Sequence, residues 1–195
     1  MDIANQTNGL VIGTGDMSEL ALGWATYNGD HMSMYGVNAG VPKTLISHLI
    51  TYAVKGFDDQ ELKQVLHDVV ETPISPELLP STDGDIIQKT EDLVGPYELH
   101  DFFLFHTLRY HVGPSKIYTL AKHAFTDDYE EEIILKWLEV FYNRFFSQQF
   151  KRSCMPDGPS IGSISLSPRA GLRMPSDACV ALWLEELHLL KASGA

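Results

Sequence analysis

The sequence predicts an α/β protein in which one or a few parallel strands precede a mostly helical remainder. Residues 9–13 form a continuous apolar run without alternation, which is typical of a strand buried on both faces of a parallel sheet. From residue 97 onward, apolar side chains recur at helical spacing over most of the chain. The 195 residues suit one domain, and their 44% apolar and 21% charged content is ordinary for a globular chain.

The first strand is predicted to lead into a helix through a glycine-rich turn. The strand ends at the run Gly-Thr-Gly-Asp, and Asp16 or Ser18 is placed to cap the helix that follows. A strand, a glycine-rich turn and a helix N-terminus together form a crevice that accepts anions. Residues 26–41 are polar, dotted with glycine and non-periodic, so we expect a loop over this crevice.

Further helices are predicted where apolar residues recur at helical spacing between turn-forming residues. Pro42 suits the first position of a helix, whereas Gly113 and Pro114 suit the end of one helix and the start of the next. These helices are expected at residues 42–54, 58–70, 97–110, 114–125, 130–146 and 177–191. Residues 72–96 and the basic stretch after residue 146 are expected to be long connections, the second with at most one short strand.

The predicted strand has no predicted partner. A buried strand must pair its backbone groups with neighbouring strands, yet the sequence offers one confident strand among several helices. Either a partner chain supplies the missing strands, or they belong to sequence upstream of Met1. We interpret the chain as the C-terminal part of a larger domain.

The composition excludes several classes of protein. Asp and Glu outnumber Lys and Arg by 26 to 14, so binding of nucleic acid through a basic surface is not expected. No apolar run approaches the roughly 20 residues that cross a bilayer, and the N-terminus lacks the pattern of a signal peptide. The 2 cysteines do not make a disulfide framework. We therefore expect a reduced, soluble, cytoplasmic protein that binds neither nucleic acid nor membrane.

Residues 144–173 are locally cationic, with five basic residues and one acid in an otherwise acidic chain. Such a segment indicates a specific phosphate or carboxylate ligand, or alternatively a solvated loop with scattered arginines. Lys151-Arg152-Ser153 is the best candidate for an anion clamp, because lysine supplies a mobile point charge and arginine a planar fork. The alternative is a helix C-terminus whose cations complement the helix dipole.

The turn after the first strand fails the dinucleotide fingerprint G-x-G-x-x-G, because Ser18 occupies the third glycine position. What remains is the hydroxyl of Thr14, which can hydrogen-bond a nucleotide, and the carboxylate of Glu19, which can hold Mg²⁺ against phosphates. A turn with a capping Asp and a solvent-facing Glu explains the same residues. The histidine and cysteine patterns favour neither a zinc site nor a catalytic thiol, and G-x-S-x-G is absent.

Three runs closely resemble the bacterial glutamine-dependent NAD⁺ synthetases: VIGTGDMSELALGWATYNGDHMSMYGVNAGVPKTLI (11–46), VGPYELHDFFL (94–104) and FFSQQFKRSCMPDGPSIGSISLSPR (145–169). The resemblance assigns residues 1–195 to the C-terminal portion of the family's synthetase domain, and it implies an adenine-nucleotide α-hydrolase-like (HUP) fold. The family is an ATP-dependent C–N ligase that converts deamido-NAD⁺, ATP and ammonia to NAD⁺, AMP and pyrophosphate. An acyl adenylate is the intermediate, and a glutaminase domain supplies the ammonia.

The resemblance also implies which residues bind ATP and metal. Thr14, Lys43 and Ser75 match positions that contact ATP. Glu19 matches a carboxylate that lies beside Mg²⁺ and beside the dinucleotide substrate. ATP and Mg²⁺ are therefore the implied co-substrate and metal, and no prosthetic group is implied.

A second set of residues is implied for deamido-NAD⁺. The segment that lines this site is matched by Trp24, Ala25, Thr26 and Tyr27, and its aromatic rings are suited to pack on the rings of the ligand. Lys151 matches the lysine near the reacting carboxylate and phosphate, so it is the implied catalytic residue as well as a deamido-NAD⁺ ligand.

Two departures from the family pattern limit what this chain is expected to do. The family's pyrophosphate loop, S-G-G-x-D-S, whose Asp is a second Mg²⁺ ligand, does not occur in the sequence. Cys154 and Cys179 do not lie in the context of a glutaminase nucleophile. We therefore expect the chain alone to be inactive.

Two other interpretations of the sequence stay open. The first is a non-catalytic, dinucleotide-binding helical fragment that self-associates, because the family's synthetase domains form homodimers or higher homo-oligomers. The second, from the residues alone, is an unrelated helical domain that binds a phosphate ligand.

Overall fold

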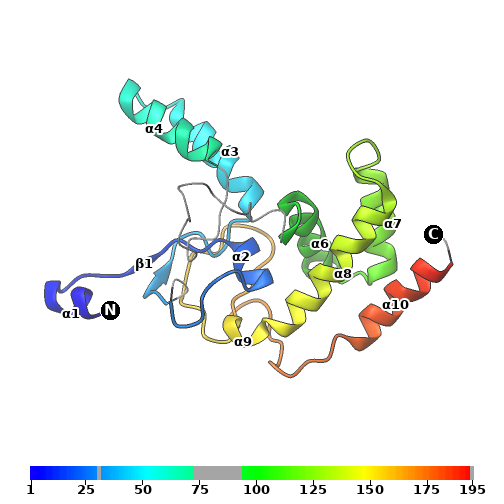
Figure 1. Cartoon of the computed structure of the whole chain (residues 1–195). Helices are drawn as coiled ribbons and strands as arrows, with labels where there is room; N and C mark the ends of the chain where they lie inside the picture. Colours follow the sequence, from blue (N-terminus) through cyan, green and yellow to red (C-terminus); the bar gives the residue numbers. More distant parts are fainter. Residues whose placement is uncertain (30–31, 73–93, 194–195) are drawn as a thin grey trace, which may run out of the picture.

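The computed structural model describes residues 1–29, 32–72 and 94–193. The first part of the chain contains α1 (Asp2–Thr7), β1 (Ile12–Gly13), α2 (Met17–Leu22), β2 (Tyr35–Gly36), α3 (Lys43–Val54) and α4 (Gln60–Glu71). The second part contains α6 (Tyr97–Tyr110), α7 (Pro114–Ala124), α8 (Glu131–Ser147), α9 (Gln149–Arg152) and α10 (Ala181–Ala192). Helices α6, α7, α8 and α10 pack together as a block, and α3 and α4 extend away from it as a hairpin (Figure 1).

A small parallel sheet lies between the N-terminal segment and the helical block. Ile12 of β1 is paired with Tyr35 of β2, and Gly13 with Gly36. Tyr35 also forms a parallel bridge with Asp157. The prediction of an unbroken loop over 26–41 is therefore wrong at β2, and β1 has a partner inside this chain. A two-residue strand carries no periodicity, so the sequence pattern does not reveal it.

The prediction that residues 9–13 are buried on both faces is also wrong. Leu10 is 61% exposed and Ile12 is 47% exposed, whereas Gly13 is buried. Within the described residues β2 is the one strand paired with β1, so the other edge of β1 is open. The apolar run therefore reflects a strand that this chain covers only in part.

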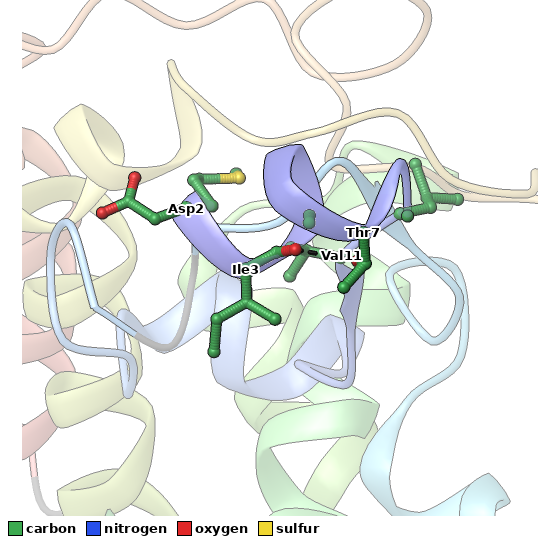
Figure 2. Close-up of a pocket in the computed structure, with 8 residues that line it drawn as sticks. Asp2, Ile3, Thr7 and Val11 are labelled. Atoms are coloured by element: carbon green, nitrogen blue, oxygen red, sulfur yellow. Dashed lines mark hydrogen bonds between the residues drawn. The ribbon is translucent and has the colours of Figure 1, made fainter.

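A hollow lies beside α1, at the N-terminal end of the structure (Figure 2). Its lining comes from α1 and from the chain that leads to β1, and Oγ1 of Thr7 donates a hydrogen bond of 2.8 Å to the carbonyl of Ile3 there. None of the residues predicted to bind ligand lines this hollow.

The main core forms between α6, α7, α8 and α10, as the helical periodicity predicts. Phe103 of α6, Ile117 of α7 and Phe141 of α8 are fully buried in it, and Leu187 of α10 is almost so. Burying one side chain of this kind contributes about 1.5–3 kcal/mol. Met17, Ala21 and Leu22 of α2 join the same core, so the block holds the short helix α2 in place.

Helix α4 packs on α3, which also contacts α6 and α2, and neither α3 nor α4 contains a fully buried residue. Leu45, Leu49 and Tyr52 recur at helical spacing along α3, but the structure leaves all three exposed. The half-buried side of α3 instead contains Ile46 and Ile50. No helix in the described part of the chain is both long and apolar enough to span a membrane.

Candidate functional site

Two carboxylates meet at the N-terminus of α2. Asp16 caps this helix: its Oδ1 accepts a hydrogen bond of 2.9 Å from the backbone N–H of Glu19. In return, Oε2 of Glu19 accepts one of 3.1 Å from the backbone N–H of Asp16. This reciprocal capping box satisfies two helix-terminal donors, which explains why the sequence Asp-Met-Ser-Glu starts a helix here. It also fixes both side chains at the end of the turn that follows β1.

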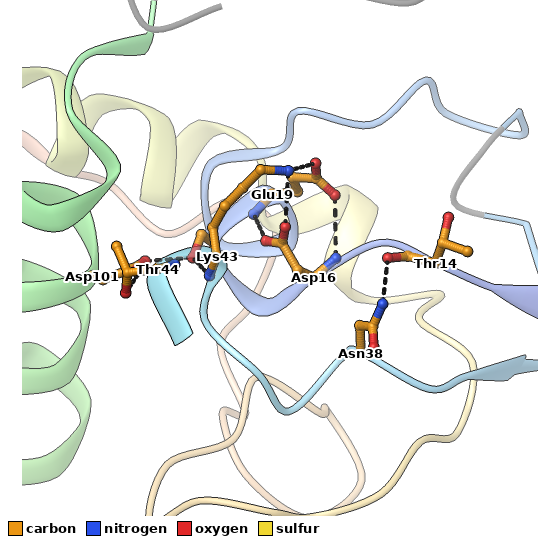
Figure 3. A network of polar contacts seen from close by, with 8 residues as sticks. Thr14, Asp16, Glu19, Asn38, Lys43, Thr44 and Asp101 are labelled. Atoms are coloured by element: carbon orange, nitrogen blue, oxygen red, sulfur yellow. Dashed lines mark hydrogen bonds and ion pairs between the residues drawn. The ribbon is translucent and has the colours of Figure 1, made fainter. Parts of the chain in front are cut away.

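Lys43, the first residue of α3, places its ammonium group between these carboxylates (Figure 3). Its Nζ lies 2.5 Å from Oε1 of Glu19 and 3.1 Å from Oδ2 of Asp16. Burial and the nearby charge of Glu19 raise the pKa of Asp16 to about 6, in spite of the lysine. Burial lowers the pKa of Lys43, but the two carboxylates outweigh it and the pKa is raised overall.

Thr14 stands at the same end of α2, in the turn between β1 and the helix. Its side chain is exposed, and its backbone carbonyl accepts a hydrogen bond of 3.1 Å from Nδ2 of Asn38 (Figure 3). Asn38 lies in the predicted loop after residue 26, so this contact confirms that the loop packs against the turn. The structure thus brings Thr14, Glu19 and Lys43, three of the predicted ligand residues, to one end of α2.

Three cations gather at the opposite end of α2. Nε of Arg144 donates to the carbonyl of Leu22 at 2.8 Å, and Nζ of Lys151 donates to the carbonyls of Gly23 and Ala25, each at 2.7 Å. Arg152 donates to the carbonyl of Ala21. The last carbonyls of a helix have no partner within the helix and carry partial negative charge, so cations stabilise them.

The prediction that Arg152 forms an anion clamp with Lys151 is wrong. Arg152 is fully buried, and its guanidinium also donates to the backbone carbonyl of Phe145 and, at 2.9 Å, to the side chain of Gln149. It therefore faces backbone and core rather than a ligand. Lys151 is less buried and contacts the segment predicted to line the deamido-NAD⁺ site.

The segment 24–27 leaves the end of α2 under this group of cations. Trp24 is half-buried, and the guanidinium carbon of Arg144 lies 3.8 Å from the centre of its indole ring. The Nε1 atom of Trp24 is buried without a hydrogen-bond partner among the described residues. Tyr27 is 47% exposed, and its ring contacts that of Phe150 at 5.3 Å between centroids. Each aromatic ring of this segment therefore packs on a neighbouring side chain and keeps part of its surface exposed.

The predicted residues therefore fall into two sets, at the two ends of one short helix. The six residues of α2 span about 9 Å, which is less than the length of a dinucleotide. Ser75, the third predicted ATP contact, lies outside the described residues.

Magnesium binding by Glu19 stays a prediction, and the arrangement does not fit a divalent cation held by protein ligands. Each carboxylate oxygen of Asp16 and Glu19 already has a partner, either Lys43 or a backbone N–H of the capping box. In the described ranges, no group of three or more His, Cys, Asp and Glu side chains is placed to hold a metal ion.

Sequence reasoning missed two parts of this site. It singled out Lys151 and Arg152 as a pair, whereas Arg144 is the cation that lies over Trp24. It also passed over Asp101 of α6, whose carboxylate accepts hydrogen bonds from Ser18 and Thr44. The pattern of apolar residues on α6 gives no sign of this contact, because it depends on residues 57 and 83 positions away.

The raised pKa of Asp16 gives the stability of the fold a pH dependence. In the folded chain the pKa is about 6, against an ordinary value of 3.8. Between these values the folded state binds more protons than the unfolded state, so stability falls as pH rises. The stabilisation is complete below about pH 4 and is lost as the pH passes through 6. This difference between the folded and unfolded pKa corresponds to about 3 kcal/mol of folding free energy over the whole pH range.

Replacing Asp16 with asparagine tests this prediction, because asparagine caps a helix about as well but does not titrate. We expect the free energy of unfolding of the parent chain, measured in urea relative to that of Asp16→Asn, to fall by about 2 kcal/mol between pH 4 and pH 6.5. If the difference in free energy of unfolding between the parent and Asp16→Asn stays constant across this range, the raised pKa of the buried Asp16 carboxyl is contradicted.

Comparison with known proteins identifies the family of the chain. Residues 1–106 match the family model described as NAD synthase. The glutamine-dependent NAD(+) synthetase of Mycobacterium leprae (strain TN) is 45% identical over 206 residues, an alignment that covers 95% of this chain and 30% of that protein. The glutamine-dependent NAD(+) synthetase of Mycobacterium tuberculosis (strain ATCC 25618 / H37Rv) is 46% identical over 205 residues, with the same coverage of 95% and 30%.

A solved structure supports the fold. The crystal structure of a glutamine-dependent NAD(+) synthetase from Cytophaga hutchinsonii matches this chain with a TM-score of 0.70 at 21% identity, over 95% of this chain and 27% of that one. This likeness confirms the predicted fold class, an α/β fold with few parallel strands and a mostly helical remainder. The chain spans about 30% of the length of the curated relatives it matches. On the family match and this fold together, the chain belongs to the NAD synthase family.

Proposed function

We propose that residues 1–195 form the C-terminal portion of the synthetase domain of a glutamine-dependent NAD⁺ synthetase. The proposed reaction joins ammonia to the nicotinate carboxylate of deamido-NAD⁺. The carboxylate first attacks the α-phosphate of ATP, which releases pyrophosphate and gives an acyl adenylate. Ammonia then displaces AMP and leaves the amide of NAD⁺. The observation that carries this proposal is the separation of two predicted ligand sets by the one short helix α2.

The N-terminal end of α2 is the proposed ATP end. Thr14 offers an exposed hydroxyl at this end, and Lys43 offers an ammonium group that is paired with Asp16 and Glu19. Glu19 holds Lys43 in place, so in this proposal it orients the cation. Ser75 belongs to the same proposed set by resemblance.

The C-terminal end of α2 is the proposed deamido-NAD⁺ end. Trp24 to Tyr27 supply aromatic and backbone surface for the ligand. Lys151 lies at this end, where its Nζ donates at 2.7 Å to the carbonyl of Gly23, just before the segment, and to that of Ala25, within it. We propose that it both positions the segment and stabilises the negative charge that develops between carboxylate and phosphate.

The wider setting of this reaction follows from the same proposal. Ammonia would come from glutamine hydrolysed in a separate glutaminase domain, and the synthetase would act in the cytoplasm as a homo-oligomer. Magnesium would accompany ATP as its usual counter-ion, and no step here is assigned to it.

The chain on its own should make no NAD⁺ from deamido-NAD⁺, ATP, Mg²⁺ and ammonium. The sequence does not contain the S-G-G-x-D-S loop, whose backbone N–H groups hold the leaving pyrophosphate in the family. The purified chain should be assayed by chromatography of the nucleotides. NAD⁺ above the level of an enzyme-free blank, dependent on ammonium, would contradict this expectation. Binding of deamido-NAD⁺ without turnover would mark this chain alone as a dinucleotide-binding fragment.

A further inference from the structure

The N-terminus of α3 has no cap of its own. Its capping position is Pro42, which offers no side-chain acceptor for the first N–H groups of the helix. The first backbone N–H groups of any helix lack partners within the helix, and leaving them buried without partners is costly. In this structure the partners come from two other helices. The N–H of Lys43 donates to Oγ of Ser18 in α2 at 2.8 Å, and the N–H of Thr44 donates to Oδ2 of Asp101 in α6 at 3.1 Å.

The Asp101 carboxylate joins these contacts into one network (Figure 3). Its Oδ2 also accepts a hydrogen bond of 2.7 Å from Oγ1 of Thr44, and its Oδ1 accepts one from Oγ of Ser18. One carboxylate on α6 therefore ties together the N-termini of α2 and α3. Glu19 projects from the first of these helices and Lys43 from the second, and their side chains meet at 2.5 Å.

We propose that Asp101 is a positioning residue for the Lys43–Glu19 ion pair. It does not contact the pair itself. It acts as an N-cap that another helix of the same chain supplies. This contact sets where α3 begins, and so where the Lys43 side chain starts. That Lys43 then meets phosphate is the part of this inference that rests on the proposed function.

The observations favour positioning over a purely stabilising role. The Asp101 carboxylate accepts three hydrogen bonds, one from Ser18 and two from Thr44, and both residues stand at the starts of the helices that carry Glu19 and Lys43. Because Lys43 is the first residue of α3, any shift of the helix start displaces its side chain directly. Burial raises the pKa of Asp101 and its hydrogen-bond donors lower it, which agrees with a carboxylate held in a closed network.

The test measures the chemical reactivity of Lys43 in the folded chain. Only an uncharged lysine reacts with an acylating reagent, so an ion pair slows the reaction. Lys55, exposed at the other end of α3, serves as the internal reference. We expect Asp101→Asn to raise the ratio of Lys43 to Lys55 acetylation by about tenfold, which corresponds to one unit of pKa. Glu98→Gln, which also neutralises a carboxylate on α6, should leave the ratio unchanged.

A second variant keeps the test decisive if Asp101→Asn does not fold. Thr44→Val removes one of the two bonds from Thr44 to Asp101 and keeps the backbone bond, so it should raise the ratio by a smaller factor. Rescue by Thr44→Ser, which restores the hydroxyl, is expected. If the ratio is the same in the parent chain, Asp101→Asn and Thr44→Val, the inference is overturned, whatever happens to their stability.

Adding ATP to the parent chain separates this inference from the proposed function. ATP should slow the acetylation of Lys43 if the ion pair faces the phosphates. Failure of ATP to protect Lys43 would count against the proposed function, while the effect of Asp101→Asn on the unliganded chain would still decide the inference about positioning.

Discussion

Replacing Arg152 with alanine should lower the free energy of unfolding by about 3–5 kcal/mol. The guanidinium is fully buried and donates to the carbonyls of Ala21 and Phe145, which would be left without partners. Removing a buried charged donor leaves unsatisfied acceptors and a cavity, and losses of this size follow. Burial lowers the pKa of Arg152 to about 10, so the side chain is still charged at neutral pH.

Urea unfolding followed by circular dichroism measures this loss. Arg169→Ala is the matched control, because Arg169 is 47% exposed and its ion pair with Asp157 is at the surface. A surface pair of this kind contributes at most about 1 kcal/mol. Equal losses for Arg152 and Arg169 would show that the buried guanidinium does not hold the end of α2.

In a full-length synthetase that contains this sequence, Lys151→Ala should lower kcat far more than Arg169→Ala. Lys151 holds the carbonyls of Gly23 and Ala25 and lies at the proposed deamido-NAD⁺ end. Losing one donor that stabilises developing charge raises the activation barrier by about 2–4 kcal/mol. Steady-state kinetics with ammonium in place of glutamine isolates the synthetase step.

The same comparison has a clear contrary outcome. Arg169 donates to Asp157 and to the carbonyl of Met155, away from the predicted ligand residues. Equal and mild losses of kcat at both positions would show that Lys151 adds only to the local positive charge and does not specifically stabilise the transition state. A normal kcat with a raised KM for Lys151→Ala would show that it binds the substrate without stabilising the transition state.

Local chemistry accounts for the parts of the fold that the sequence predicts well. The helices around Phe103, Ile117 and Phe141 follow from apolar spacing, and Asp16 caps α2 as its residue type favours. Gly113 and Pro114 mark the boundary before α7 for the same reason. Each of these features depends on residues within a few positions of one another.

The parts that the sequence does not predict depend on contacts distant along the chain. Lys151 and Arg152 are neighbours with similar chemistry, and only the packing of α9 against α2 decides which of them is buried. The pairing of Lys43 with Asp16 joins the first residue of α3 to the N-cap of α2, so neither residue's local sequence predicts it. The strand β2 was missed because two residues against β1 leave no pattern in the chain.

The most direct test of the proposed site is a pair of NMR titrations on the ¹⁵N-labelled chain, one with ATP and one with deamido-NAD⁺. A site with two separate ends predicts that ATP shifts the amides of Thr14 and Lys43, at one end of α2. It predicts that deamido-NAD⁺ instead shifts the indole N–H of Trp24 and the amide of Thr26, at the other end. If neither ligand perturbs its own end at millimolar concentration, or if both perturb the same residues equally, the two-ended site proposed here is contradicted.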